Sequence, residues 1–336
     1  MNILILGGTA FFGKDMVRLL HGEGHSVSLF TRGKTVPHDL PPVRHFKGDR
    51  KNPADLRKTL QGTSWDVVID NIAYNALDVG AALDIFKECG RYILTSTVSV
   101  YRFAKSQFPQ PYREGDIDFD AKPALEGPAD VHWQYARGKM EAERACLRQK
   151  QVAWTILRPP IVYGPNEGVD ARGFWYLERL LSGGPIILAN GGLNASRLVY
   201  SVDVARSFLR VIEQPNTIGK IYNVAQDEII TLRNFIDESA RVLNVKPDYV
   251  SIPLDYLKMH NVGEFAGEYA FANSWIQDIA AAKKDFDYRP TPFSQFCPST
   301  AVWYRDNWRG SKEKLLATRP QEIELARKWI QALKCV

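Results

Sequence analysis

The segment ILILGGTAFFGKDMV, residues 3–17, sets a short apolar run, a glycine-rich turn and an amphipathic stretch in direct succession. This order predicts a buried strand, a tight turn and a helix from Phe12 to His21. The first N–H groups of such a helix have no partner within it and lie at the positive end of its dipole, so they attract phosphate. The segment therefore predicts a strand–turn–helix unit that can hold a phosphate-bearing ligand.

The turn follows the pattern Gly7-x-x-Ala10-x-x-Gly13. Gly7 permits the tight turn, and Gly13 permits close packing of the helix on the strand. Ala10 stands where the backbone approaches phosphate, and its methyl group is compatible with that approach if its φ is negative. We expect the turn to contact the pyrophosphate of a dinucleotide through Gly7, Thr9, Ala10, Phe11, Phe12 and Gly13.

Apolar runs separated by amphipathic stretches predict the rest of a sheet. They are rich in valine, isoleucine and leucine without polar alternation, which is typical of strands buried on both faces. The runs are Asn2–Leu6, Ser26–Phe30, Val43–Phe46, Asp66–Asp70, Arg91–Thr95 and Val152–Leu157. With helices between them, one capped by Asn52 and begun by Pro53, they predict an α/β fold with a doubly wound, Rossmann-like parallel sheet.

The regular alternation ends near residue 165, and shorter pieces follow, among them a helix from Val202. We therefore predict a dinucleotide-binding domain over residues 1–164 and a smaller, mixed substrate-binding domain over 165–336. Some segments of the second half are expected to return to the first domain. The last helical stretch should pack on the body or on a subunit partner through Ile323, Ala326, Ile330 and Leu333.

The end of the second strand distinguishes the two nicotinamide cofactors. NAD sites usually place an acidic side chain there to hold the ribose 2′-hydroxyl. In LFTRGK this chain has Thr31 and Arg32 instead, and an arginine pairs well with a 2′-phosphate. The sequence thus favours NADP(H) over NAD(H), the alternative being that Arg32 is a solvated loop charge. Asp49, after the third strand, is expected within reach of the adenine amino group.

The segment WQYARGKMEAE places Tyr135 and Lys139 four residues apart, on one face of a predicted helix. A phenol with its ordinary pKa of about 10 is a poor base at neutral pH. A lysine ammonium one turn away favours the phenolate and can also bind ribose hydroxyls. The pair is therefore a candidate for acid–base chemistry beside a bound dinucleotide.

These motifs, in this order, resemble the extended short-chain dehydrogenase/reductases, the NAD(P)-dependent epimerase/dehydratase family. The matching stretches lie within about residues 1–230, and DIAAAKKDFDYRPTPF and AVWYRDN look like the family's C-terminal region. They are GGTAFFG, DVVIDNIAYN, YILTSTVSVY, YARGK, LRPPIVYGP, RLVYSVDVARS and GKIYNVAQDEIITL. The resemblance is specific for the fold and much less so for the substrate.

The resemblance implies roles for particular residues. Thr97 would hydrogen-bond the substrate oxygen, Tyr135 would donate or accept the hydroxyl proton, and Lys139 would hold the nicotinamide ribose and lower the pKa of the tyrosine. Arg197 matches an arginine that binds a substrate diphosphate, although a structural partnership with Asp203 is an open alternative. The remaining assignments are Asn71, Ile72, Ala73 and Pro159 beside the cofactor and Ser99 beside the substrate.

Three departures from the family pattern narrow the activity. Ala10 replaces the usual glycine, as in an atypical branch that includes nucleotide-sugar epimerase-like proteins and chloroplast RNA-binding relatives. Val98 and Ser99 stand where sugar 4,6-dehydratases carry an Asp-Glu pair, so an acid and a base for eliminating water are missing. Asp70-Asn71 replaces a histidine followed by leucine at the end of the fourth strand.

The sequence predicts an NAD(P)(H)-dependent oxidoreductase or epimerase that acts on a hydroxyl or carbonyl carbon of a small molecule, with a nucleotide sugar as one candidate. An epimerase would return the hydride to the other face, whereas a reductase would release reduced product. A non-catalytic NADP(H)-sensing regulator or an RNA-binding relative is the alternative. The intact set of Thr97, Tyr135 and Lys139 favours the enzyme.

Composition excludes several other classes. The formal charge of +5 is compatible with an anionic small molecule without requiring nucleic acid, and no stretch approaches a membrane span. The six histidines and four cysteines show no metal-type spacing, so we expect no metal and reduced, buried thiols. No basic stretch precedes the first apolar run, which argues against a signal peptide. We therefore expect a cytoplasmic protein, with a homodimer among the assemblies considered.

Overall fold

The structure is a computed structural model that describes residues 1–34, 39–106, 110–120, 131–167, 172–259 and 276–334. The chain divides into two compact units. Met1–Val162, Val199–Ala225 and Gln277–Pro290 form the first unit, and Tyr163–Leu198, Gln226–Ile276 and Thr291–Val336 form the second. The chain thus leaves the first unit after Val162 and returns to it twice.

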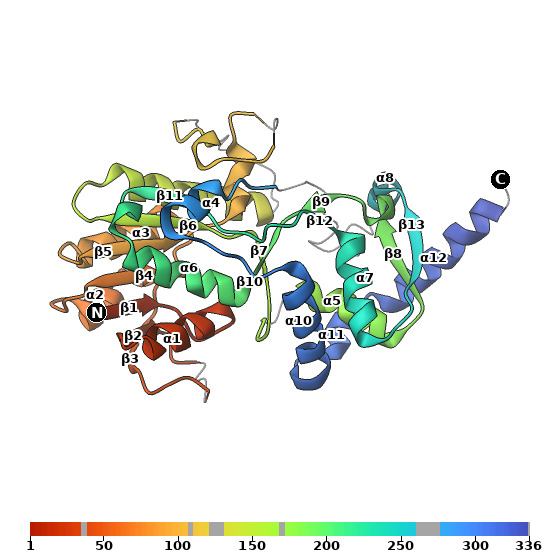
Figure 1. Ribbon diagram of the computed structural model, residues 1–336, viewed down its shortest axis with the longest axis horizontal. Helices are drawn as coiled ribbons and strands as arrows, with labels where there is room; N and C mark the ends of the chain where they lie inside the picture. The colour runs from red at the N-terminus through yellow and green to blue at the C-terminus, as the bar shows by residue number, and fades with distance from the viewer. Residues whose placement is uncertain (35–38, 107–109, 121–130, 168–171, 260–275, 335–336) are drawn as a thin grey trace. The chain divides into compact units, whose positions relative to one another are not determined.

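The first unit is built on a seven-stranded sheet with the strand order β11-β6-β5-β4-β1-β2-β3 (Figure 1). Neighbouring strands pair in parallel. The strands are β1 (Asn2–Leu6), β2 (Ser26–Thr31), β3 (Arg44–Lys47), β4 (Val67–Asp70), β5 (Arg91–Thr95), β6 (Trp154–Arg158) and β11 (Lys220–Asn223). This arrangement confirms the predicted doubly wound, Rossmann-like fold.

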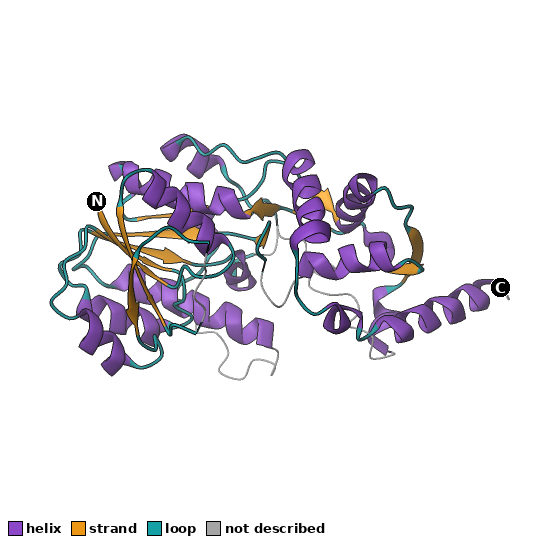
Figure 2. Cartoon of the chain, turned by 90° about the horizontal axis from the view of Figure 1, so that it is seen from below, coloured by secondary structure: helices purple, strands orange, loops and turns teal. Residues whose placement is uncertain are grey.

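Helices cover both faces of this sheet (Figure 2). Ile3 and Ile5 of β1 pack with α1, α6 and α9 on one face, whereas Leu4 and Leu6 pack with α2, α3 and α4 on the other. Both sets are fully buried, which explains why the strands read as continuous apolar runs. The helices are α1 (Phe12–Gly22), α2 (Pro53–Leu60), α3 (Ala76–Ile85), α4 (Val131–Arg148), α6 (Ser201–Glu213) and α9 (Ala280–Phe286), with 3₁₀ turns η1 (Val98–Phe103), η2 (Glu114–Asp116) and η4 (Pro215–Thr217).

The expected elements appear with small shifts at their ends. The third strand begins at Arg44 rather than Val43, the sixth at Trp154 rather than Val152, and the helix expected from Val202 begins at Ser201. Strand ends depend on which backbone groups find a partner, and hydrophobicity does not report this. Asn52 caps α2 as expected, accepting a hydrogen bond from the Ala54 N–H at 3.0 Å.

The strand order fixes where a ligand can bind. From β1 the chain proceeds to β2 and β3 on one side, and β4, β5 and β6 lie on the other. Ligands of such sheets bind at this switch point, beyond the carboxyl ends of the strands. The loops after Leu6, Asp70 and Thr95 therefore lie at the edge of the sheet that is expected to bind the cofactor.

The second unit is mainly helical. Its core includes Ile187, Val250 and Ile252 from the parallel pair β8–β13, with Ala326 of the last helix packed against them. Its helices are α5 (Arg172–Ser182), α7 (Leu232–Leu243), α8 (Leu254–Met259), α10 (Phe293–Asn307), α11 (Lys312–Leu316) and α12 (Arg319–Lys334). Its strands are β8 (Pro185–Ala189), β9 (Ala195–Ser196), β12 (Ile230–Thr231) and β13 (Asp248–Ile252), with the 3₁₀ turn η3 (Asn190–Gly192). The residues of β7 (Ile161–Tyr163) and of β10 (Leu198–Tyr200) are each divided between the two units.

In α12, Ala326 is buried, whereas Ile330 and Leu333 are exposed, so only part of the expected apolar stripe packs within the described chain. Phe174 and Tyr176 of α5 are buried, and the Phe174 ring packs against Tyr163 and Tyr304 of the same unit. No helix in the described ranges is both long and apolar enough to cross a membrane.

Candidate active site

The glycine-rich turn after β1 brings the start of α1 very close to the sheet. Gly7 and Gly8 have φ values of 102° and 92°, which side-chain-bearing residues rarely adopt. A Cβ atom added at Gly13 would lie 2.8 Å from the Cα of Gly8, so Gly13 is what allows α1 to approach the turn. The roles expected of Gly7 and Gly13 therefore have a direct steric basis.

The strained backbone of the turn falls on Phe11 rather than on Ala10. Phe11 has φ 48° and ψ −134°, a conformation that costs a non-glycine residue about 1–3 kcal/mol, whereas Ala10 does not have a positive φ. The condition for close approach at Ala10 is therefore met. Because no side chain caps α1, the helix start offers its N–H groups to a ligand.

The end of β2 carries positive charge without a carboxylate. Arg32 is exposed, and within the described chain it has no ion-pair partner. The aliphatic part of Lys47 packs over Gly33, which places a second cationic side chain at this end of the sheet. The Thr31 hydroxyl lies 2.6 Å from Nε2 of His45. This surface suits an anionic group on the adenosine half of a dinucleotide.

Asp49, the residue expected near the adenine, lies in the turn after β3. Its Oδ1 accepts a hydrogen bond from the Lys51 N–H at 2.9 Å, and its own N–H donates to Oδ2 of Asp55 at 3.2 Å. These bonds fix the turn while leaving Oδ2 of Asp49 without a hydrogen bond in the described chain.

Lys139 is the most constrained of the expected catalytic residues. Its side chain is 3% exposed, and its Nζ donates to the carbonyl oxygens of Ala73 at 2.7 Å and Thr95 at 2.9 Å. Burial lowers the pKa of the ammonium to about 8, although the negative charges of Asp70 and Glu143 act in the opposite direction. Lys139 therefore joins α4 to the carboxyl ends of β4 and β5.

Tyr135 lies one turn before Lys139 on α4 and remains 39% exposed. The Lys139 Nζ lies 5.9 Å from the centre of the Tyr135 ring and 4.8 Å from that of Tyr74, a residue that the sequence reasoning did not single out. The two ring centres are 6.3 Å apart. A Cβ atom at Gly138 would lie only 2.3 Å from the Tyr74 carbonyl oxygen, so this glycine lets α4 approach the loop after β4.

Thr97 follows β5 and is buried at the start of η1. Its Oγ1 accepts a hydrogen bond from the Ser99 N–H at 3.2 Å and donates to the Ser99 Oγ at 3.3 Å. The Val98 N–H donates to the Pro159 carbonyl oxygen at 3.2 Å, which ties this turn to the end of β6. The structure thus places Thr97, Ser99 and Pro159 together at the ends of neighbouring strands.

A buried ionic network that the sequence reasoning missed supports these residues. Oε1 and Oε2 of Glu143 accept hydrogen bonds from Nε and Nη2 of Arg158 at 2.9 and 2.6 Å, and both side chains are 0% exposed. Glu143 also accepts a hydrogen bond from the hydroxyl of Ser96, the residue before Thr97. Tyr135, Lys139 and Glu143 follow at intervals of four, and this spacing on α4 was the available signal.

The end of β4 carries a second buried ion pair. Oδ2 of Asp70 accepts hydrogen bonds from Nη2 of Arg50 at 2.6 Å and from the Tyr92 hydroxyl at 2.7 Å. Beside it, the Asn71 Oδ1 is buried and has no hydrogen-bond partner in the described chain. The Asn71 side chain borders the space above Gly7, where a Cβ atom would lie 3.6 Å from the Asn71 Cβ.

These features fit a dinucleotide. The turn has no room for side chains at its glycines, the start of α1 is uncapped, and the Asn71 side chain, whose Oδ1 has no hydrogen-bond partner in the described chain, borders the turn at Gly7. Arg32 follows β2 on one side of the switch point, whereas Lys139 contacts the ends of β4 and β5 on the other side. Ile72 and Ala73 continue the loop after β4 and so lie with Asn71.

Arg197, expected to bind substrate, belongs to the second unit, where one of its guanidinium nitrogens donates to the Asp227 carbonyl oxygen at 3.1 Å. His132 on α4 is exposed.

Cys89, Cys146 and Cys297 are buried free thiols, as expected, and Cys335 lies outside the described residues. No group of three metal-ligating side chains occurs within the described part of the chain.

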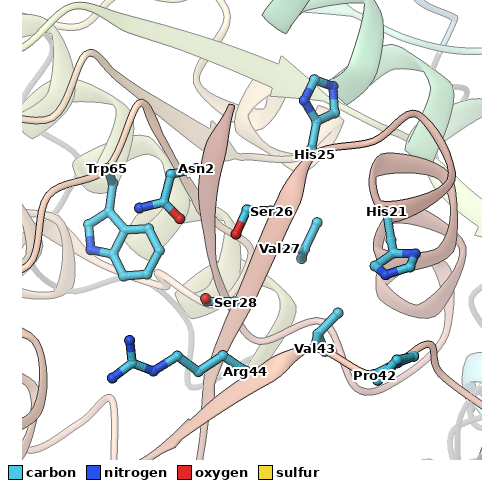
Figure 3. A pocket seen from close by; sticks show the side chains of 10 residues that line it. All are labelled: Asn2, His21, His25, Ser26, Val27, Ser28, Pro42, Val43, Arg44 and Trp65. Atoms are coloured by element: carbon cyan, nitrogen blue, oxygen red, sulfur yellow. The ribbon is translucent and has the colours of Figure 1, made fainter.

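A separate pocket of about 320 Å³ lies at the amino ends of β1 and β2, opposite the carboxyl ends where the candidate site lies (Figure 3). Its wall includes Asn2 and Ser26, the first residues of β1 and β2, with His21, His25 and Arg44 around them. It contains none of the residues that the sequence associates with the cofactor or with catalysis.

A doubly wound parallel sheet with a glycine-rich first turn and a Tyr–Lys pair one helical turn apart defines a dinucleotide-binding protein of the extended short-chain dehydrogenase/reductase class. The chain belongs to the NAD dependent epimerase/dehydratase family, whose model matches residues 3–225. The family resemblance drawn from the sequence is therefore confirmed.

Two similar proteins carry names that state different activities, binding of a stem-loop and synthesis of nucleotide sugars. The chloroplast stem-loop binding protein of 41 kDa b from Arabidopsis thaliana is 33% identical over 243 residues, which cover 68% of this chain and 60% of that protein. The UDP-D-apiose/UDP-D-xylose synthase of Oryza sativa subsp. japonica is 27% identical over 274 residues, covering 72% of this chain and 67% of the synthase. The chain thus spans about three fifths of the first relative's length.

Solved structures confirm the fold. The UDP-glucuronic acid 4-epimerase of Bacillus cereus, solved in complex with NAD, superposes with a TM-score of 0.69 at 18% identity, covering 92% of this chain and all of the epimerase. At this level of identity the similarity concerns the fold alone.

Proposed function

We propose that the protein is an NAD(P)(H)-dependent oxidoreductase or epimerase that acts on a hydroxyl or carbonyl carbon of a small molecule, with a nucleotide sugar as the leading substrate class. The observation that carries the proposal is the placement of Lys139. Its buried ammonium is held by the ends of β4 and β5, on the side of the switch point where the nicotinamide half of a dinucleotide belongs, and Tyr135 lies one turn away.

When bound, the nicotinamide supplies or accepts a hydride. Tyr135 is the proposed proton donor or acceptor for the substrate oxygen, and the Lys139 ammonium favours its phenolate form by charge. Thr97 hydrogen-bonds the same oxygen once its hydroxyl, which donates to Ser99 in the structure, rotates toward the substrate. Pro159 and Asn71 lie on the proposed nicotinamide side, and Lys139 also offers its remaining N–H to a ribose hydroxyl.

NADP(H) is the proposed cofactor in preference to NAD(H). The end of β2 presents the exposed Arg32 and no carboxylate, so a ribose 2′-phosphate finds a cation rather than a repelling charge. Asp49 is the proposed partner of the adenine amino group through its remaining carboxylate oxygen.

The ligand that copurifies with the protein tests this function. Mass spectrometry of the denatured protein should detect NADP(H) or NAD(H) in it, and added NADPH should bind. Tightly held cofactor, no NADPH consumption and conversion of a nucleotide sugar to its epimer indicate an epimerase. Consumption of NADPH indicates a reductase. Absence of any nicotinamide dinucleotide together with no NADPH binding would refute the proposal.

A second candidate function is RNA binding without catalysis, because a relative that is 33% identical is named as a stem-loop binding protein. A filter-binding titration with a labelled RNA stem-loop tests it over a series of salt concentrations. Specific binding requires competition by the unlabelled stem-loop but not by an unrelated RNA. The third candidate, an NADP(H) sensor, would bind the cofactor with no turnover of any sugar nucleotide.

A further inference from the structure

Tyr74 lies in the candidate active site, but the chemistry proposed above assigns it no role. It follows the loop Asn71–Ala73 at the end of β4, on the same side of the switch point as Lys139. Its backbone is fixed: the Tyr74 N–H donates to Oδ2 of Asp78 at 2.8 Å, and its carbonyl oxygen packs against Gly138. Tyr74 is thus held by main-chain contacts rather than by its ring.

Tyr74 is only about half buried. Tyr74 is 48% exposed, yet its ring borders the buried Lys139 ammonium at 4.8 Å. With Tyr135 it places two aromatic rings, 6.3 Å apart and inclined by 55°, around one cation. An aromatic residue that is half exposed and has a fixed backbone beside a buried charge offers a contact surface to a ligand.

The neighbours of Tyr74 identify the part of the ligand that it meets. The pyrophosphate belongs at the start of α1 and the adenosine at the end of β2, so the nicotinamide riboside extends over β4 and β5. Lys139 and the buried, unpartnered Asn71 Oδ1 supply polar groups for ribose hydroxyls there. Burial and the charges of Asp70 and Asp78 raise the pKa of Tyr74, so its phenol stays protonated and its ring neutral.

We propose that Tyr74 is a cofactor-contacting residue whose exposed ring packs against the nicotinamide riboside and, with Tyr135, encloses the Lys139 ammonium. This inference rests on the proposed dinucleotide function. The proposed contact involves the nicotinamide end of the ligand and not its adenosine end. The experiment therefore compares a ligand that has the nicotinamide end with a ligand that lacks it.

The test compares NADPH with adenosine 2′-phosphate 5′-diphosphate, which lacks the whole nicotinamide riboside, by calorimetric titration of the wild-type protein and Tyr74→Ala. An aromatic contact is worth about 0.5–1.5 kcal/mol, so the variant should bind NADPH about 2- to 13-fold more weakly. Its affinity for adenosine 2′-phosphate 5′-diphosphate should stay unchanged. Tyr74→Phe should bind both ligands like the wild type, because it retains the ring.

Leu77→Ala, at an exposed position of α3 close in sequence, is the matched control and should alter neither affinity. The native fold is expected to survive in Tyr74→Ala because the hydrogen bond made by Tyr74 comes from its main chain; Tyr74→Leu serves if it does not. Equal weakening of both ligands, or no weakening of either, overturns the inference while leaving the proposed function standing. If the wild type binds neither ligand, the proposed function fails and the inference with it.

Discussion

Glu143→Gln tests whether the network beneath the candidate active site stabilises the first unit. The substitution keeps the shape of the side chain but removes its charge, leaving the Arg158 guanidinium buried without a counter-ion. One carboxylate oxygen that accepts from Arg158 becomes an amide NH₂, which cannot accept a hydrogen bond. Removing one partner of a buried ion pair costs about 3–5 kcal/mol.

This cost is large beside the total stability of a domain, about 5–15 kcal/mol. Hydrogen exchange followed by mass spectrometry on peptides from β5 and β6 reports the opening of the first unit alone. At a tenfold change for each 1.4 kcal/mol, amides that exchange by global opening of that unit should exchange about 140- to 3700-fold faster in Glu143→Gln.

Glu141→Gln is the control, because Glu141 pairs with Arg137 on the part-exposed face of the same helix at 2.9 Å. An exposed pair contributes about 0–1 kcal/mol, so exchange should change by less than about fivefold. A double variant, Glu143→Leu with Arg158→Met, should recover much of the loss because no unpaired charge remains. If Glu143→Gln behaves like Glu141→Gln, the network does not stabilise the unit and the reasoning fails.

Three further outcomes are expected. In a fluorescence titration, Arg32→Ala should weaken the binding of NADPH about 10- to 100-fold and the binding of NADH less than twofold, because only NADPH has the 2′-phosphate. Equal losses of affinity for the two cofactors would contradict the assignment of Arg32. With a pKa of about 8, Lys139 should lose its proton between about pH 7 and pH 9. Its ¹³Cε resonance should therefore titrate in that range, well below the range of the other lysines, and a midpoint near pH 10 would contradict this. Gly138→Ala should lower the free energy of unfolding by about 1–3 kcal/mol, and with it Tm, because the added methyl group meets the Tyr74 carbonyl oxygen. Gly80→Ala, in α3 with open space around it, should instead stabilise the protein, and equal Tm shifts for the two variants would refute the steric argument.

The sequence predicted the first unit well for a physical reason. Strands such as β1 are buried on both faces, so they appear as apolar runs, and Gly13 at the first turn reports a contact that only glycine permits. The ends of the strands were less predictable because they depend on hydrogen-bond partners rather than hydrophobicity. The same limit applies to the short strands β9 and β12, which pair over two residues.

The candidate site was predictable only in part. Tyr135 and Lys139 stand out through their spacing, but Glu143 and Arg158 look like ordinary charged residues until the fold buries them against each other. Tyr74 was missed because exposure and proximity to Lys139 are properties of the fold, not of the sequence around it. The strain at Phe11 could not be foreseen either, since a φ of 48° at a phenylalanine contradicts local preference.

Turnover by Tyr135→Phe tests the account's central claim most directly, at saturating NADPH for a carbonyl substrate or at saturating NADP⁺ for a hydroxyl substrate. With a panel of nucleotide sugars, product formation in the wild type identifies the substrate to be used for the comparison. The account predicts that Tyr135→Phe binds NADPH within about twofold of the wild type but turns over at least about 100-fold more slowly, since it has lost the proton donor. A variant that binds NADPH and retains wild-type turnover would contradict catalysis by Tyr135.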